Sequence, residues 1–276
     1  MRTELCLHDI ASGETRVLLA TDRLVEAPNW APGGGYLLVN ADGGLYRVPF
    51  ERPALLAVDL GPHDGLNNDH GISPDGRVYA YCDKTETGKS IIYTVPAAGG
   101  ASRRVTALGP SWWHGWSPDG TELAYAAIRG GQFAIAACAA DGSGERLLVR
   151  GPGHYDGPDY TPDGQWIWFN SDRGGSMQLW RVPAAGGDPE EMTRGPRDAW
   201  FPHPSPDGRH LLYLAYPEGT DGHPRDLDVA LRLIDLGTGR DRELFGLFGG
   251  QGTINTPCWA PGGRRFAFCR YAPPPA

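Results

Sequence analysis

Short apolar runs alternate with polar, glycine-rich stretches along the whole chain. One unit shows the pattern in full: residues 165–170 are rich in aromatic and β-branched side chains, and residues 178–182 alternate between apolar and polar ones. The stretches 171–175 and 184–187 that follow these runs are rich in glycine. Such a pattern is typical of short strands joined by tight turns. No segment carries a sustained period of 3.6 residues, so we expect almost no helix.

One tight turn recurs six times. Four copies read Ser/Thr-Pro-Asp-Gly and two degenerate copies read Ala-Pro-Gly-Gly, with their prolines 42, 44, 44, 44 and 55 residues apart. Proline presets φ, aspartate bonds back to the backbone, and glycine takes the positive φ that ends the turn. A period in the forties is typical of repeat architectures. The turn prolines are Pro32, Pro74, Pro118, Pro162, Pro206 and Pro261.

The repeat predicts one all-β domain that spans residues 1–276 and consists of six four-stranded antiparallel blades, a six-bladed β-propeller. The last unit supplies only two strands, at 258–259 and 265–269. Residues 5–13 resemble residues 231–239, which are expected to form a third strand and its turn. We therefore expect the N-terminal strands to pair with the C-terminal strands and close the ring, which removes exposed sheet edges.

Composition and charge narrow the classes of function. Glycine (40) and proline (25) are abundant but lie at the turns, and an apolar content of 40% is enough for a packed core. The net charge is −8 and the only lysines are Lys84 and Lys89, so nucleic acid and anionic membrane surfaces are poor partners. No apolar run approaches the roughly 18 residues that a transmembrane helix needs.

The cysteines and the N-terminus bear on the cellular compartment. Five cysteines lie far apart in the sequence, which favours reduced, buried thiols over a disulfide framework or a zinc site. Residues 1–8 lack the apolar core of a secretion signal. We expect a cytoplasmic location if this is the natural full length, and a periplasmic one if a leader has been removed.

An aromatic residue stands two positions before four of the turn prolines, at Trp30, Trp116, Tyr160 and Trp259. Together with the Gly-Gly turns, this pattern resembles the TolB-like family of six-bladed propellers, built from WD40-like (PD40) repeats. The resemblance covers essentially the whole chain. It implies the propeller fold, and it allows a non-catalytic scaffold that binds proteins or peptides on its rim, as TolB does.

Histidines gather at one end of the predicted ring, where the innermost strands begin. Four of the eight, from four consecutive blades, lie there: His70, His114, His154 and His203. Imidazoles that converge on the central channel could hold a divalent metal ion such as Mn, Ca or Zn, with an oxygen ligand beside them. The alternative is that these histidines bond to neighbouring blades or to channel water. The predicted metal ligands are His70, His154, His203 and Gln251.

Two long loops fall at the same end. The fifth unit is lengthened at 216–228, and the stretch 248–255 is dense in glycine. Loops on a rigid scaffold often carry function, although a neutral insertion and a tight blade-to-blade turn are the alternatives. Aromatic rings at this end could stack on a sugar, which makes a saccharide the favoured small ligand. The predicted ligand-binding residues are Asn68, Asp156, Arg173, Trp200, His223 and Asn255.

No Gly-x-Ser-x-Gly and no His-Glu-x-x-His motif occurs, so the chain does not match peptidase or esterase propellers. Through the repeat, His203 and Gln251, with His70, His114 and His154 as weaker matches, it loosely resembles oligogalacturonate lyases. That resemblance implies a metal ion that neutralises a sugar carboxylate or carbonyl, and a base that takes the adjacent proton. The predicted catalytic residues are Tyr155 and His114, in a metal-dependent lyase or hydrolase.

Overall fold

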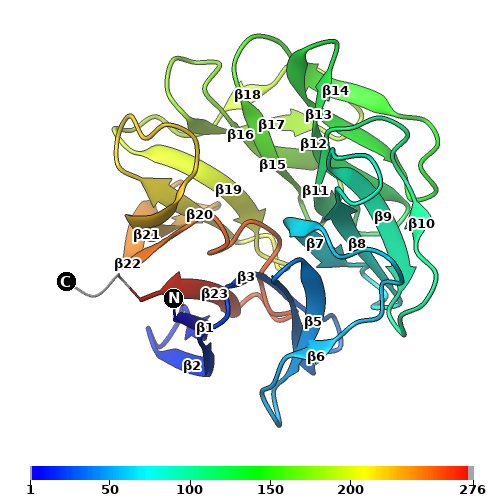
Figure 1. Ribbon diagram of the computed structural model, residues 1–276. Coiled ribbons are helices and arrows are strands. Elements are labelled where there is room, and N and C mark those ends of the chain that lie inside the picture. The colour runs from blue at the N-terminus through cyan, green and yellow to red at the C-terminus, as the bar shows by residue number, and fades with distance from the viewer. Residues whose placement is uncertain (1, 273–276) are drawn as a thin grey trace.

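The computed structural model describes residues 2–272, and this part of the chain folds into strands and turns without any helix. Figure 1 shows the strands as antiparallel sheets arranged in a ring around a central axis. The prediction of an all-β, six-bladed propeller is therefore confirmed. In residues 2–272 nothing helical is long and apolar enough to cross a membrane.

Five blades contain four strands each, and in each blade the strand nearest the axis comes first in the chain (Figure 1). The first three are β3 (Val25–Trp30), β4 (Tyr36–Ala41), β5 (Gly44–Pro49) and β6 (Leu56–Ala57); β7 (Leu66–Ile72), β8 (Val78–Asp83), β9 (Ile91–Pro96) and β10 (Arg103–Arg104); and β11 (Ser111–Trp116), β12 (Glu122–Arg129), β13 (Gln132–Ala139) and β14 (Arg146–Arg150).

The fourth and fifth blades follow the same order. They are β15 (Tyr155–Tyr160), β16 (Trp166–Ser171), β17 (Gln178–Pro183) and β18 (Glu190–Glu191), then β19 (Asp198–Pro204), β20 (His210–Tyr216), β21 (Arg225–Asp235) and β22 (Asp241–Gly250).

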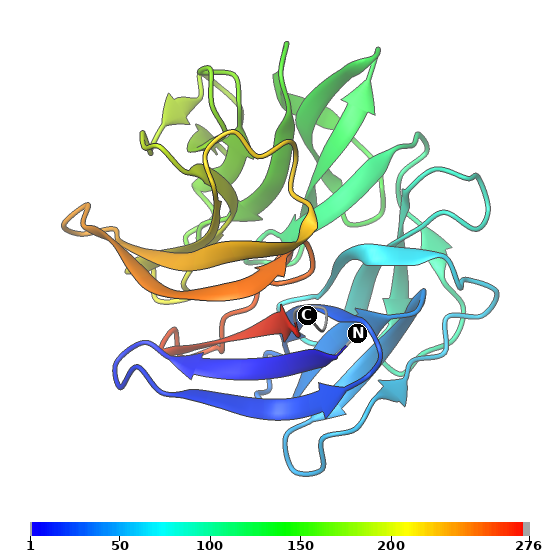
Figure 2. The same ribbon diagram turned by 60° about the vertical axis from the view of Figure 1, so that its left-hand side comes forward.

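Both ends of the chain build the sixth blade. Its sheet has the order β2 (Thr15–Thr21), β1 (Thr3–Asp9) and β23 (Arg265–Tyr271), and a single bridge from Trp259 to Phe266 marks the inner strand. The strand β1 pairs with β23 along its whole length, as Figure 2 shows. The predicted closure of the ring by the N-terminal strands is confirmed.

The Pro-Asp-Gly turns close in the way their residue types require. In the copy at 117–120, the Ser117 hydroxyl donates to the Asp119 carboxylate at 2.6 Å, and the Gly120 N–H donates to the Ser117 carbonyl at 2.8 Å. Gly120 has a φ of 72°, which a side chain would make costly. Each of these turns follows an innermost strand. The six turns therefore lie at one end of the ring, and the innermost strands begin at the other end.

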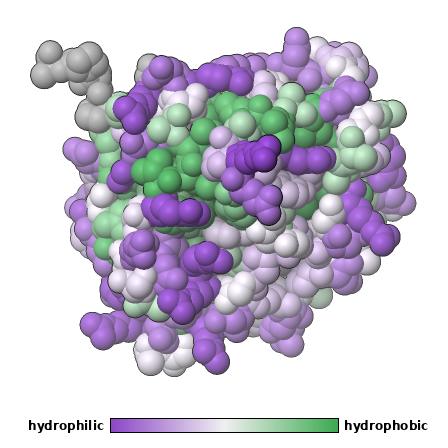
Figure 3. Space-filling model, turned by 90° about the horizontal axis from the view of Figure 1, so that it is seen from below, coloured by the Kyte–Doolittle hydropathy of each residue, from purple (hydrophilic) through white to green (hydrophobic). Residues whose placement is uncertain are grey.

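Apolar residues pack between the blades and also reach the surface. All five cysteines are buried and free, as the sequence indicates. On the face drawn in Figure 3, apolar residues gather into a patch that a few polar side chains cross. Val17 of β2 and Leu56 of β6 are exposed at 41% and 51%, so part of the rim of the propeller is apolar.

The contact between the second and third blades leaves no room for a side chain at Gly71. A Cβ atom built there would lie 2.0 Å from the ring of Trp113, which is itself buried. We expect Gly71→Ala to lower the free energy of unfolding by roughly 1–3 kcal/mol, because overpacking shifts the backbone or the ring. Gly33→Ala is the control, since nothing lies within 4 Å of that position. Equal denaturation midpoints for both variants would contradict the prediction.

Candidate functional site

A cavity of about 260 Å³ opens at the end of the ring where the innermost strands begin. Its wall is shared by the second, third and fourth blades, by the loop between β20 and β21, and by the segment that leads from β22 into the sixth blade. The lining residues are Asn67, Asn68, Asp69, Trp112, His114, Ala126, Phe133, His154, Asp156, His223, Gln251 and Asn255.

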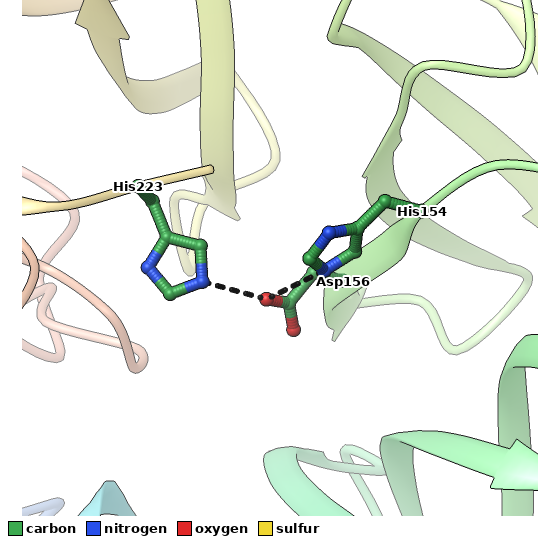
Figure 4. Close-up of side chains that lie close together, drawn as sticks. All are labelled: His154, Asp156 and His223. Atoms are coloured by element: carbon green, nitrogen blue, oxygen red, sulfur yellow. Dashed lines mark ion pairs between the residues drawn. The ribbon is translucent and has the colours of Figure 1, made fainter. Parts of the chain in front are cut away.

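Two histidines and one aspartate converge in this cavity, as Figure 4 shows. The Oδ2 atom of Asp156 lies 3.6 Å from Nε2 of His154 and 3.4 Å from Nε2 of His223. Asp156 belongs to β15, His154 directly precedes that strand, and His223 comes from the lengthened loop of the fifth blade. Their three nearest ligand atoms all lie within 4.8 Å of one another, which is close enough to share a metal ion.

A buried imidazole holds the other side of Asp156. Nε2 of His114 lies 2.9 Å from Oδ1 of Asp156, and Nδ1 of His114 donates to the carbonyl of Asn255 at 3.1 Å. Burial alone would lower the pKa of His114, but the Asp156 carboxylate raises it to about 9. Burial likewise opposes ionisation of Asp156, yet His114 holds its pKa well below the usual range. The two groups therefore form a charged pair at neutral pH.

Asp69 is a second carboxyl group in the cavity, and fewer polar groups bond to it than to Asp156. Its Oδ2 accepts from the side-chain amide of Asn67 at 2.6 Å, and its Oδ1 lies 4.0 Å from Nε2 of His114. Burial raises the pKa of Asp69 to about 6, against the attraction of His114. The cavity thus contains one carboxylate that stays ionised and one carboxyl group that can exchange a proton near neutral pH.

The structure brings seven of the twelve predicted site residues to this cavity. They are Asn68, His114, His154, Asp156, His223, Gln251 and Asn255. Trp200 lies directly behind the wall: its ring centroid is 4.5 Å from that of His223 and 5.3 Å from that of His154.

Two predicted metal ligands lie elsewhere. His203 is fully buried, with Nδ1 at 3.0 Å from Asp159 and Nε2 donating to the carbonyl of Ile254 at 2.6 Å, so neither nitrogen is free for a metal. His70 is also fully buried and lies 3.4 Å from the carbonyl of Leu38, and burial lowers its pKa to about 4. The predicted group His70, His154, His203 and Gln251 is therefore not assembled around one point.

Tyr155 and Arg173 also lie apart from the cavity lining. The Tyr155 hydroxyl donates to the carbonyl of Pro152 at 3.3 Å, and its buried ring packs near Phe169. The guanidinium of Arg173 lies 5.1 Å above the ring of Trp180. Neither side chain is placed to meet a ligand that sits between His114 and His154.

Sequence reasoning did not single out Asn67, Asp69 and Phe133, whereas Trp112 is one of the aromatic residues that it expected to stack on a sugar. Asp69 stands beside the predicted Asn68 and His70, and simple alternation would place it on the opposite face from both. Pairing with β8 is irregular between Leu66 and His70, so three consecutive residues there reach the cavity. This irregular pairing is a property of the backbone, and no residue type in this run predicts it.

The fold and the cavity together define a six-bladed propeller with a polar channel mouth. The family described as PD40, the TolB beta propeller domain, matches residues 114–230. The uncharacterized protein Atu1656 of Agrobacterium fabrum is 48% identical over 274 residues, which cover 99% of this chain and 94% of that protein. The chain belongs to the TolB-like β-propeller family, as the resemblance implied.

Solved structures support the same family assignment. A provisionally named TolB from Agrobacterium tumefaciens has a TM-score of 0.97 at 48% identity and 99% coverage of both chains. TolB from Acinetobacter baumannii has a TM-score of 0.69 at 17% identity, covering 91% of this chain and 64% of that one. An oligogalacturonate lyase in complex with manganese has a TM-score of 0.60 at 16% identity, covering 90% and 74%. The last two likenesses are evidence for the fold alone.

Proposed function

We propose that the cavity binds a small, hydroxyl-rich ligand, with a saccharide as the favoured class. The observation that carries this proposal is the convergence of amides, carboxyl groups and imidazoles from successive blades around one cavity of about 260 Å³. Such convergent polar groups in a concave site are the ordinary basis for a binding-site hypothesis.

The chemistry of the wall suits sugar hydroxyls. A hydroxyl both donates and accepts hydrogen bonds, and the amides of Asn68 and Gln251 offer both functions. The Oδ1 atom of Asn255 already accepts from the Gly252 N–H at 2.6 Å, so Asn255 offers its side-chain N–H groups. Among residues 2–272, the Gln251 side chain has no hydrogen-bond partner, so it is available to a ligand. The rings of Trp112 and Phe133 lie 6.2 Å apart and nearly parallel, at 21°. Their apolar surface can pack against the C–H face of a sugar ring.

Metal-assisted lyase or hydrolase chemistry at this cavity stays a prediction. In such a reaction Asp69 is better placed to move a proton than Tyr155 or His114. Tyr155 lies outside the cavity, and both ring nitrogens of His114 are already bonded to Asp156 and Asn255. Asp69 keeps one oxygen without a hydrogen bond among the described residues, and its pKa of about 6 suits both proton uptake and release.

The test is a glycan array that selects a ligand, followed by calorimetric titration of the variants. Gln251→Ala and Trp112→Ala are expected to weaken the affinity roughly tenfold each, the cost of about one hydrogen bond or one ring contact. His210→Ala is the matched control, because His210 begins β20 at the opposite end of the ring. Absence of binding by the native chain, or cavity variants that bind as tightly as the native chain, would contradict the proposal.

The apolar rim favours a second candidate function, a scaffold that binds a protein or peptide. The supporting observations are the exposure of Val17 and Leu56 and the apolar patch on the face drawn in Figure 3. In that case Leu56→Asp abolishes binding of the partner and Gln251→Ala leaves it intact. If binding is lost only in Gln251→Ala and kept in Leu56→Asp, the cavity and not the rim is the binding site.

A further inference from the structure

We propose that His154, Asp156 and His223 form a binding site for one first-row transition-metal ion of the zinc type. The site shares the cavity with the proposed saccharide, but it does not depend on the identity of that ligand. It differs from the predicted group, of which it keeps only His154, because Asp156 and His223 stand in place of His70, His203 and Gln251.

The distances fit a shared ion better than they fit direct bonds. The Asp156 oxygen lies 3.6 Å and 3.4 Å from the two imidazole nitrogens, longer than an ordinary hydrogen bond. Ligand atoms at about 2.0–2.2 Å from a tetrahedral zinc ion stand roughly 3.3–3.6 Å apart. Asp156 therefore has the separation from both histidines that an ion between them requires, and all three ligand atoms lie within 4.8 Å of one another.

Asp156 is held so that only one oxygen faces the two histidines. Its Oδ1 is bound by Nε2 of His114 and by the backbone N–H of Gly157, each at 2.9 Å. His114 is fixed in turn by the carbonyl of Asn255. This is the kind of support that orients ligands at metal sites. It restricts Asp156 to a single-oxygen ligand through Oδ2.

Aromatic contacts fix both imidazole rings. His154 stacks on Phe133 with centroids 4.3 Å apart and an interplanar angle of 16°. His223 lies edge-on to Trp200 at 4.5 Å and to Phe201 at 5.1 Å. Since these packed rings have little freedom to turn, the entropy lost when an ion binds is small.

The lengthened loop of the fifth blade supplies the third ligand. The N–H of Thr220 donates to Asp198 at 3.0 Å, and the carbonyl of Pro224 accepts from the Tyr216 hydroxyl at 3.1 Å and from the Gln251 N–H at 3.2 Å. These bonds anchor the loop on both sides of His223. The insertion, which sequence alone left open as a neutral feature, thereby completes the group.

The ligand types select the ion. Two imidazole nitrogens and one single-oxygen carboxylate suit zinc and its transition-metal neighbours. Calcium prefers six to eight oxygen ligands, and magnesium prefers an octahedral oxygen shell. Three protein ligands also leave a coordination position open toward the cavity, where water or a ligand oxygen can bind.

The test uses chelator-treated full chain, titrated with Zn²⁺, Mn²⁺, Ca²⁺ and Mg²⁺ separately, without any sugar. We expect one Zn²⁺ per chain, tighter than Ca²⁺ or Mg²⁺, and a roughly 100-fold or greater loss of affinity in His154→Ala and His223→Ala, beyond the loss from removing a supporting partner. Both side chains are partly exposed, at 28% and 20%, so the variants are expected to fold.

His210→Ala, from the opposite end of the ring, serves as the control and should bind Zn²⁺ like the native chain. Unfolding curves of all variants show whether the fold is kept. If the native chain shows no saturable Zn²⁺ binding, or if the two cavity variants bind Zn²⁺ as tightly as the native chain, the metal site is overturned. Because sugar binding is measured separately, a metal-free protein that still binds sugar refutes only this inference, and a zinc protein that binds no sugar refutes only the proposed function.

Discussion

Replacing Asp159 with alanine is expected to lower the free energy of unfolding by roughly 3–5 kcal/mol. Asp159 of β15 bonds to Nδ1 of His203 in β19 at 3.0 Å, and Nε2 of His203 donates to the carbonyl of Ile254 at 2.6 Å. The fourth blade, the fifth blade and the segment that leads into the sixth are thus joined through one imidazole with no exposed surface. Because the N–H at Nε2 of His203 donates to the Ile254 carbonyl, the bond between Nδ1 and the Asp159 carboxyl group must contain one proton. Alanine would leave that ring nitrogen buried without a partner.

Guanidinium denaturation at neutral pH measures this cost. Asp188→Ala is the control, because Asp188 is exposed, and its removal should change stability by no more than about 0.5 kcal/mol. A double-mutant cycle with His203→Ala separates the pair from general effects of burial. A loss below about 1 kcal/mol in Asp159→Ala would show that the blades are not held together by this pair.

The fold could be predicted because its signals are local. The turn at 117–120 needs only neighbouring residues to close, and strand alternation is visible over a few positions. Even the closure of the ring was accessible, since residues 5–13 carry the pattern of a third strand and β1 pairs with β23. The turn and the strand alternation recur in successive units, so an ambiguous unit can be interpreted from the others.

The site was less accessible because the innermost strands are irregular where they meet the cavity. Pairing shifts between Leu66 and His70, and again between Asp156 and Asp159. In the corresponding irregular stretches of other blades, Ala27 and Phe201 take φ values of 51° and 54°, a conformation that favours glycine. Such bulges change which side chains face the axis. Alternation alone therefore groups His70 with Asn68 and apart from Asp69, whereas Asn68 and Asp69 both line the cavity and His70 is buried beside them.

Deletion of residues 1–21 is expected to abolish cooperative folding. It removes β1 and β2, so β23 loses the partner with which it pairs from Thr3–Tyr271 to Asp9–Arg265. Leu5, Cys6 and Leu7 leave the core with them. The free energy of unfolding of a domain is only about 5–15 kcal/mol, and the loss of two strands from a closed ring exceeds that. Circular dichroism and thermal melting measure the result.

A circular permutant distinguishes loss of closure from loss of mere length. It begins at Asp22 and carries residues 1–21 after Ala276, so that the closing strands are supplied as a hairpin with β23. Because Thr3 and Tyr271 are paired neighbours, the seven residues 272–276 and 1–2 can serve as the connecting loop. We expect this permutant to recover one cooperative transition and the zinc affinity of the native order. If the permutant fails while the deletion variant still melts cooperatively, strand pairing between the two ends of the chain is not what holds the ring shut.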